Sequence, residues 1–563
     1  MALNTASSDP RNRLSRRELT IDIVWVVIRT IVGACLRFWK LDYGLPHILF
    51  IDEGQKIYLA LNMGGGDLNP HNFVQPSFFY YLLLLADVLY IAWNFMTGVF
   101  KELSEAWRLY TQDPTVYYWL ARSVSAAFGT VTIPLTYIIG QRFFNRFVGG
   151  CAALFLAFSY IHAQYSQVGY IDITLTFFIT FCFLLSVTAQ ETGHWRYFML
   201  AGFVGGLSMS TKYSGLPTMI LGPIASYTFA LRNGKPVIRE ILGKKTMLFY
   251  LSALIGFTFG TPYWVLDFPK FSEDVLYFWG DYKLGGVGQL GAEGKWNWFY
   301  YLFNPLCYGL GLPLEITGIA GILWLALRRR LSVVLFVVFP LVYFFILGLS
   351  DIRTPRYIMP LIPFLCLGAA FFLDQTGARI ARLKTKWGGL CLLSLVLVVV
   401  SPSAVNLLRY NYLKLQQDTR KLARDWVLEN IKPEEKFIQT LYAFIGFSLA
   451  EILDHSVWNT RLQHASSLKT LDEYRQEGVR YLVLDDWHTG TVLTGVERNP
   501  KYQETGVRYR RFLKQLDSTA KLVAEFSPYS KPGDHFDPEN LEFISRSLWK
   551  MKRLGPRIQI YKL

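Results

Sequence analysis

The sequence predicts an α-helical membrane protein with about eleven transmembrane helices, followed by a small α/β domain at its C-terminal end. Three observations indicate this fold class. The chain has 563 residues, of which 52% are hydrophobic, 16% are aromatic and only 18% are charged. Soluble globular chains carry about 25% charged residues, so this composition is typical of a membrane protein. Apolar segments recur through the first 406 residues, whereas the remaining residues form a polar tail.

Short clusters of lysine and arginine separate many of the apolar segments. The net charge of +15 lies largely in these clusters, which is the positive-inside pattern of membrane proteins and a weak argument for nucleic-acid binding. The predicted apolar segments are 20–40, 77–97, 118–140, 147–163, 173–190, 196–211, 214–231, 247–266, 298–327, 332–350, 356–373 and 387–406.

One segment, 77–97, conflicts with the charge pattern if it crosses the membrane. Five basic clusters, which include Arg142 and Arg196, fall on the cytoplasmic side only when 77–97 is a juxtamembrane or re-entrant helix. Hydropathy alone leaves a plain transmembrane span equally open. We therefore predict a long first external loop over 41–117, with the N-terminus inside and the C-terminus outside.

The chain divides into three predicted regions. Residues 1–19 form a disordered cytoplasmic tail before a retained signal-anchor helix, because no small-residue cleavage site follows the first apolar segment. Residues 20–406 form the transmembrane domain, and 407–563 form an external α/β domain. Within that domain, helical patterns cover 414–430 and 441–453, and strand patterns cover 480–487 and 558–563. All six cysteines lie in apolar stretches, so no disulfide framework is predicted for the tail.

Three acidic residues are the main candidates for chemistry. Asp52 and Glu53 are adjacent and follow the first apolar segment, and Asp172 opens a later one. Charged groups beside a bilayer are costly, so they mark a functional site, and the charge count places all three on the external face. One carboxylate there can act as a general base, and several together can instead hold a divalent cation. The structural alternative is that Asp52 or Glu53 caps the helix that follows.

Several cations are predicted on the same face. Arg122 begins one span, Lys212 lies in a turn between two spans, and Arg353 and Arg356 precede another. Arginine suits bidentate binding of phosphate and lysine supplies a point charge, so the group fits an anionic lipid headgroup beside a catalytic base. The alternative is that long basic side chains extend to the membrane surface without binding anything.

The remaining polar residues are predicted to be structural. Asp267 is expected to cap or pair at the start of a loop that reaches residue 296, and part of that loop is glycine-rich enough to fold over a substrate. His47, His71 and His162 match no metal-ligand spacing, so we expect them to make structural hydrogen bonds.

The motifs together resemble the GT-C class of membrane glycosyltransferases, nearest to the protein mannosyltransferases and aminoarabinose transferases. The resemblance spans roughly residues 20–410 and the ending of the tail. It rests on DE at 52–53, GDLNPH at 66–71 with QPSFFYYL at 75–82, RSVSA at 122–126, the acid at 172, STKYSG at 210–215, RTPRYIMPLIPF at 353–364 and GPRIQIYKL at 555–563.

The resemblance implies transfer of one sugar from a polyprenyl-phosphate donor to an acceptor on the external face, with inversion at the anomeric carbon. It also implies the following roles: Asp52 is the catalytic base, with Glu53 beside it; Asp172 orients the acceptor or the sugar; and Arg122, Lys212, Arg356 and Tyr357 hold the donor phosphate.

Two departures from the family limit these implications. QPSF replaces the HPPL-type segment of the eukaryotic mannosyltransferases, which leaves the acceptor open among lipid, glycan and protein. The chain lacks the WWDYG-type signature of the metal-dependent oligosaccharyltransferases, so we predict no metal and no other cofactor.

Two other classes of function explain the sequence less well. A transporter or flippase would place polar residues near the membrane midplane, often within inverted repeats, and no repeat is visible in this sequence. A scaffold that presents the external domain to a partner would explain neither the acids nor Lys212.

Overall fold

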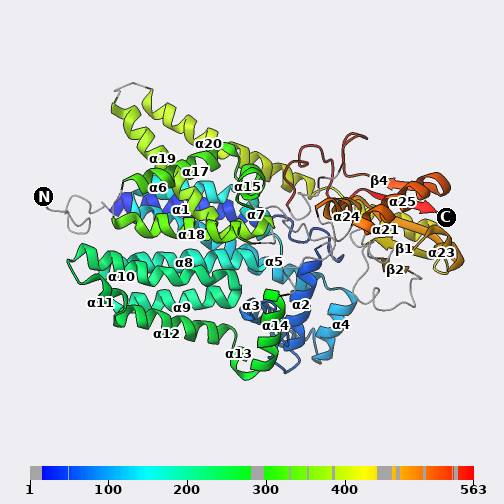
Figure 1. Ribbon diagram of the computed structural model, residues 1–563, viewed down its shortest axis with the longest axis horizontal. Coiled ribbons are helices and arrows are strands. Elements are labelled where there is room, and N and C mark those ends of the chain that lie inside the picture. The colour runs from blue at the N-terminus through cyan, green and yellow to red at the C-terminus, as the bar shows by residue number, and fades with distance from the viewer. Residues whose placement is uncertain are drawn as a thin grey trace.

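The protein, seen in a computed structural model, is a long helical bundle with a small sheet at one end (Figure 1). The start of α1 (Arg16–Arg37) lies at the opposite end of the bundle, and the predicted fold class is confirmed. We call the end of the bundle that faces the sheet the site end. The structure describes residues 16–47, 50–280, 297–328, 331–350, 354–382, 387–440, 460–463, 469–498, 503–535, 537 and 543–563.

The helical bundle contains the following elements, in chain order: α1 (Arg16–Arg37), α2 (Ile51–Met63), α3 (Phe78–Met96), α4 (Ser104–Gln112), α5 (Thr115–Phe143), α6 (Arg146–Ala157), α7 (Tyr160–Ser166), α8 (Ile171–Thr192), α9 (Trp195–Thr211), the 3₁₀ segment η2 (Tyr213–Ile220), α10 (Leu221–Arg232), α11 (Val237–Ile241), α12 (Lys244–Gly260), α13 (Tyr263–Leu266), α14 (Phe268–Gly280), α15 (Asn297–Tyr301), η4 (Leu302–Leu306), α16 (Cys307–Gly309), α17 (Leu312–Leu327), η5 (Leu331–Val333), α18 (Val334–Gly348), η6 (Pro355–Leu361), α19 (Ile362–Arg382) and α20 (Gly388–Leu413).

Membrane-length helices account for part of the predicted spans. By length and composition, six described helices are long and apolar enough to cross a bilayer, and there are seven if the pair α6 and α7, bent by 57°, is one span. The other predicted segments form shorter or less apolar helices, which are α1, α9, α10, α12 and α17. The chain is thus an integral, multi-pass membrane protein, and the number of eleven spans stays a prediction.

Small residues let the helices pack closely inside the bundle. On the interface of α9 and α12, a methyl group at Gly202, Gly206 or Gly256 would collide with the backbone of the facing helix. The same holds at Gly321 and Gly368, where α17 meets α19. Such contacts are typical of membrane helices, whose association depends on close packing because lipid tails are as apolar as the side chains.

The basic cluster that contains Arg142 and Arg146 lies near the start of α1, at the end of the bundle opposite the site end. Arg146 at the start of α6 pairs with Asp22 of α1 at 2.9 Å, and Arg142 at the end of α5 pairs with Glu191 at the end of α8 at 2.8 Å. The starts of α1 and α6 therefore meet the ends of α5 and α8. This arrangement agrees with the grouping of basic loops on which the predicted topology depends.

Helix α3 corresponds to the segment 77–97 that conflicted with the charge pattern. It is long and apolar enough to span a bilayer. However, Phe78 at its start lies against Gly260, the last residue of α12, while Tyr90, twelve residues later, contacts Tyr117 in the first turn of α5, with ring centroids 6.1 Å apart. Twelve helical residues cover about 18 Å, yet both contacts are at the site end. These contacts support the juxtamembrane interpretation of this segment.

The C-terminal region forms a five-stranded mixed sheet. Its strand order is β2-β1-β3-β5-β4, in which β1 pairs in parallel with β2 and β3, and β5 pairs antiparallel with β3 and β4. The elements are α21 (Thr419–Asn430), β1 (Lys436–Thr440), β2 (Thr460–Gln463), α23 (Leu471–Gln476), β3 (Val479–Asp485), α24 (Asp486–Arg498), α25 (Gln503–Thr519), β4 (Lys521–Phe526) and β5 (Ile558–Lys562).

Two apolar cores hold this sheet between helices. Ala423 and Val427 of α21 pack on one side of the sheet, and Tyr474, Tyr509 and Phe512 of α23 and α25 pack on the other.

The strands predicted at 480–487 and 558–563 are confirmed as β3 and β5. The helix predicted at 414–430 starts only at residue 419, and α20 continues to residue 413, past the predicted boundary at 406. Helix α1 starts at Arg16, inside the tail predicted over 1–19, and residues 1–15 of that tail are not described. Also outside the described residues are Arg353, the loop over 281–296 and the helix predicted at 441–453.

Candidate active site

The acidic pair lies in the first turn of α2, at the site end. The chain enters the helix through Phe50, whose backbone is extended, and no side chain caps the first turn with a hydrogen bond. The structure therefore contradicts the alternative in which Asp52 or Glu53 caps this helix with its side chain. Carboxylates in a first turn are stabilised by the partial positive charge of the helix N-terminus.

Asp52 is linked to Asp172 through Arg356. Arg356 Nη1 donates a hydrogen bond to Asp52 Oδ2 at 2.7 Å, and its Nε lies 3.9 Å from Asp172 Oδ2. Lys212 Nζ donates to Asp172 Oδ1 at 2.6 Å. Two carboxylates and two cations from α2, α8, η6 and the turn after α9 thus form one continuous group. We call these four residues the open cluster, because the side chain of Asp52 remains 43% exposed.

Local structure places each member of the open cluster. Lys212 follows the last residue of α9 in an extended conformation, and Arg356 lies in a 3₁₀ segment that begins at Pro355 after the extended residue Thr354. Asp172 occupies the first turn of α8. Each residue therefore lies at a helix terminus at the site end, where the backbone turns and the side chain can reach its neighbours.

Two tyrosines flank the cations of the open cluster. The Lys212 ammonium lies 4.2 Å from the centre of the Tyr357 ring, and the Arg356 guanidinium lies 5.0 Å from the centre of the Tyr170 ring. A cation over an aromatic face is attracted by the ring electrons and gains most when water is partly excluded. Tyr357 was predicted at the site, whereas Tyr170 was missed because nothing in its sequence context distinguishes it from a core aromatic residue.

Lys56 is a second residue that the sequence interpretation missed. It is 3% exposed, donates to the backbone oxygen of Asp52 at 2.8 Å, and lies 5.6 Å from the Tyr170 ring centre. Burial lowers the pKa of Lys56 to about 8, although the Asp52 charge opposes this shift. Its position four residues after Asp52 on one helix was a usable signal, since residues four apart share a helix face.

The pKa of Asp52 reflects these neighbours. Burial by itself would raise it, but the charges of Arg356 and Lys56 outweigh that effect and lower the pKa to about 2. Asp52 is therefore ionised at any physiological pH while Arg356 stays in contact with it.

Glu53 has a different environment from Asp52. It is fully buried and forms a bidentate pair with Arg122, through Nε to Oε1 at 2.9 Å and Nη2 to Oε2 at 2.8 Å. Glu53 Oε1 also accepts from the backbone N–H of Gly169 at 2.6 Å. Arg122 Nη1 donates to the carbonyl oxygens of Leu41 and Tyr43. Because Arg122 is committed to these partners, contact with a donor phosphate would require the pair to open.

The structure thus brings five of the seven predicted site residues to one place. Asp52, Asp172, Lys212, Arg356 and Tyr357 belong to the open cluster or touch it. Glu53 and Arg122 lie directly behind it as a buried pair. Within the described residues, no group of three histidine, cysteine or acidic side chains has a metal-binding arrangement.

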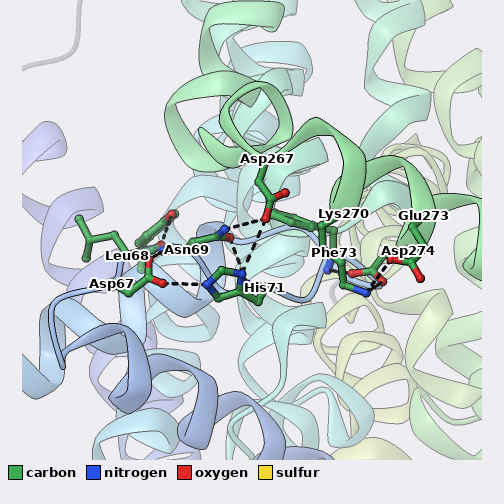
Figure 2. Close-up of polar contacts among 10 residues, drawn as sticks. Asp67, Leu68, Asn69, His71, Phe73, Asp267, Lys270, Glu273 and Asp274 are labelled. Atoms are coloured by element: carbon green, nitrogen blue, oxygen red, sulfur yellow. Dashed lines mark hydrogen bonds and ion pairs between the residues drawn. The ribbon is translucent and has the colours of Figure 1, made fainter.

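A network of polar contacts joins the first loop to α13 and α14 (Figure 2). Asn69 Nδ2 donates to Asp267 Oδ2 at 2.8 Å, and His71 lies between Asp67, 2.7 Å from its Nε2, and Asp267, 3.7 Å from its Nδ1. The predicted pairing role of Asp267 is confirmed by these contacts, and so is the structural role of His71. His162 likewise contacts the buried guanidinium of Arg37 at 3.1 Å.

The backbone of Phe73 ties this network to the open cluster. Its N–H donates to Asp274 Oδ2 at 2.7 Å, and its carbonyl oxygen accepts from the Tyr213 hydroxyl at 2.8 Å (Figure 2 shows the Asp274 side). Tyr213 is the neighbour of Lys212 in the chain. The first loop is thus fixed beside the turn that carries Lys212.

Three comparisons with known proteins show what this chain is similar to. Residues 115–265, which include Arg122, Asp172 and Lys212, match the sequence model of the family described as dolichyl-phosphate-mannose-protein mannosyltransferase. The comparison with curated proteins found no match.

Two solved structures share the fold over most of the chain. One is ArnT from Cupriavidus metallidurans bound to undecaprenyl phosphate, at 14% identity and a TM-score of 0.51, with 97% of this chain and 98% of that chain covered. The other is the oligosaccharyltransferase AglB from Archaeoglobus fulgidus, in complex with an inhibitory peptide and a dolichol-phosphate. It matches at 14% identity and a TM-score of 0.54, with 87% of this chain and 72% of that chain covered.

At this level of identity the two structures establish the fold. The resemblance to the GT-C class that the motifs indicated is confirmed by that fold and by the family match. Neither comparison supports the transporter alternative.

Proposed function

We propose that this GT-C-like membrane glycosyltransferase moves a single sugar from a polyprenyl-phosphate donor to an acceptor on the external face of the membrane. The observation that carries the proposal is the open cluster itself. Arg356 joins Asp52 to Asp172 and Lys212 completes the group, so an acceptor base and two phosphate-binding cations lie within one set of contacts. ArnT and AglB, which share the fold, were solved with undecaprenyl phosphate and dolichol-phosphate, and their ligands support a lipid-phosphate donor.

The proposed reaction is a single displacement. Asp52 accepts the proton of the acceptor as its oxygen or nitrogen forms a bond to the anomeric carbon, and the bond from that carbon to the phosphate oxygen breaks. The lipid phosphate leaves with the electron pair, and Arg356 and Lys212 stabilise its negative charge. Asp172 holds Lys212 and orients the acceptor or the sugar. Attack opposite to the leaving group inverts the anomeric centre, and no metal or other cofactor takes part in this scheme.

Donor binding would also activate the base. Arg356 contacts Asp52, whose pKa of about 2 makes it a weak base. A phosphate offers the guanidinium a competing bidentate acceptor, so Arg356 turns from Asp52 to the donor. Asp52 then loses its nearest cation, its pKa rises toward the ordinary value of a carboxyl, and it becomes a better proton acceptor. Deprotonation of the acceptor is thereby linked to the presence of donor.

In this scheme Glu53 and Arg122 have a role that differs from the catalytic and phosphate-binding roles that the family resemblance implies. Their buried pair holds the start of α2, so that Asp52 faces Arg356. The donor phosphate is bound by Arg356 and Lys212, with Tyr170 and Tyr357 behind them.

The test is sugar release by the purified full-length protein in proteoliposomes. A panel of radiolabelled polyprenyl-phosphate sugars is supplied, with water, lipid, glycan and protein fractions as acceptors. The variant Asp52→Asn is compared with Asp42→Asn, which changes an exposed carboxylate elsewhere on the first loop.

Loss of a general base typically reduces turnover by about 10²–10⁴-fold, so we expect a fall of this size in kcat for Asp52→Asn with donor KM little changed. Asp42→Asn should keep the wild-type rate. Transfer by Asp52→Asn at the wild-type rate would disprove the base assignment. Absence of transfer by the wild type from every donor of the panel would disprove the proposed function.

A further inference from the structure

The loop between α1 and α2 supports the buried pair behind the open cluster. The carbonyl oxygens of Leu41 and Tyr43 accept hydrogen bonds from Arg122 Nη1 at 2.6 and 2.8 Å. Arg122 in turn binds both carboxylate oxygens of Glu53, next to Asp52. A shift of this loop would therefore move Arg122, then Glu53, and with them the first turn of α2.

The loop is itself held by a residue of the C-terminal region. The Tyr43 hydroxyl donates to Asp418 Oδ2 at 2.9 Å, and both residues are buried. Asp418 caps α21 and binds the guanidinium of Arg420 through Nε and Nη2, at 2.8 Å each. The Arg420 guanidinium lies 5.3 Å from the ring centre of Trp487, on α24 after β3. A chain of direct contacts thus runs from α24, next to β3 of the sheet, to Glu53.

Apolar packing surrounds only part of this contact, because the Tyr43 ring belongs to the core cluster of the bundle while its other side borders a cavity. A cavity of about 160 Å³ lies beside it, lined by Lys40, Asp42, Tyr43, Lys414, Asp418 and Lys421 among others. Because the loop borders a cavity there, close packing cannot fix its position on that side. The hydrogen bond from Tyr43 to Asp418 is then a main restraint, together with a second bond from Lys414 Nζ to the Trp39 carbonyl at 3.2 Å.

The end of the chain sets the position of Asp418. The Thr419 N–H donates to the Leu554 carbonyl at 3.1 Å, and Gly555 follows with a φ of +106°. A methyl group at Gly555 would collide with Thr419 Oγ1 and Asp418 Oδ1. A substitution more than one hundred residues away in the sequence therefore perturbs the same carboxylate.

We propose that Tyr43 and Asp418 are positioning residues, through which the C-terminal domain fixes the catalytic half of the site. This inference rests on the proposed function, since it assigns Asp52 a catalytic role. The C-terminal domain is then a working part of the transferase and more than a cap over it. The donor-binding half is not held in this way, because Lys212 and Arg356 are carried by other elements.

The experiment compares Tyr43→Phe, Asp418→Asn and their double variant with Asp42→Asn as the matched control. Asp42 is on the same loop and lines the same cavity, but its side chain is exposed and pairs only with Lys40 among the described contacts. Gly555→Ala is a fourth variant that displaces Asp418 from the other end of the chain. Donor-dependent sugar release gives kcat and KM, and hydrogen–deuterium exchange reports the amides of 51–63.

A misplacement of about 1 Å can cost about 100-fold in rate, so we expect kcat to fall about 10-fold in Tyr43→Phe, Asp418→Asn and Gly555→Ala. Donor KM should stay within about twofold, because the donor-binding residues are untouched. Deuterium uptake over 51–63 should rise in these variants and stay unchanged in Asp42→Asn. The double variant should match Asp418→Asn, since Tyr43→Phe removes only the contact that both residues share, whereas Asp418 also binds Arg420.

Wild-type kcat and uptake in Tyr43→Phe and Asp418→Asn would overturn the proposal. The proposal would also be overturned if the fold-reduction of kcat in the double variant were the product of the two single reductions. The same holds if Asp42→Asn changed kcat and deuterium uptake as much as Tyr43→Phe does. If the wild type releases no sugar, the proposed function fails, and uptake over 51–63 alone decides whether the anchor holds α2.

Discussion

Asp52 and Glu53 are neighbours in the sequence, but they occupy opposite environments. The Asp52 side chain is 43% exposed and belongs to the open cluster, whereas Glu53 is fully buried against Arg122. Successive residues of a helix point about 100° apart, so one helical turn presents one acid to the site and the other to the interior. A conspicuous acidic doublet is thus two residues with separate tasks.

The two environments differ in what they permit. Both oxygens of Glu53 have fixed donors, from Arg122 and from the Gly169 backbone. Such a buried pair tolerates little movement, because removal of one partner leaves an uncompensated charge in the interior. Asp52 has one guanidinium contact and access to solvent, so it can exchange that partner for a substrate. Under the proposed function, Glu53 would hold the start of α2 in place while Asp52 remains free to exchange its partner and act as the base.

The largest effect that separates the two acids is on stability. Glu53→Gln should destabilise the protein by about 3–5 kcal/mol, because Arg122 is left buried without its counter-charge. Asp52→Asn should leave the midpoint of thermal unfolding of the detergent-solubilised protein close to the wild type, since a half-exposed carboxylate contributes little to stability. Equal midpoints for the two variants would show that Glu53 is not the structural member of the doublet.

Under the proposed function, a smaller effect separates the cations proposed to bind the donor from the proposed base. Lys212→Gln removes the cation that lies 2.6 Å from Asp172, so donor KM should rise about 10-fold, equivalent to about 1.4 kcal/mol. The control is Lys270→Gln, which removes a lysine paired with Glu273 and Asp274 outside the open cluster (Figure 2). If donor KM rises in both variants, the cause is a general loss of positive charge, and Lys212 makes no specific contact with the phosphate.

The smallest expected effect is a pH dependence from Lys56. Its folded pKa of about 8 lies below the 10.5 of a free lysine, so the unfolded chain binds more protons between these values and stability rises with pH in that window. Activity should rise as well, by about threefold as pH rises through about 8, because loss of the positive charge beside Asp52 raises the pKa of that carboxylate and makes it a better proton acceptor. Lys56→Arg keeps that charge and should remove the rise. A rise that persists in Lys56→Arg would assign it to another group.

Much of the candidate site could be predicted from the sequence. Asp52, Asp172, Lys212 and Arg356 were placed on one face by counting basic loops, because each charge cluster constrains the side on which a helix ends. Lys56 and Tyr170 were missed, since a buried lysine and an aromatic residue next to an apolar span resemble ordinary surface and core residues in sequence. The role of Arg122 depended on its partner, which lies 69 residues away and has no sequence signature.

The sequence by itself determined the membrane class, the grouping of basic loops, the open-cluster residues and the strands at 480–487 and 558–563. These properties follow from hydropathy, charge and periodicity, which are sums over neighbouring residues. The tertiary structure decided which acid is exposed, how α3 lies across the site end, and how Tyr43 reaches Asp418. Those features depend on which distant segments pack together, and close packing of side chains in a folded interior is a property of the whole chain.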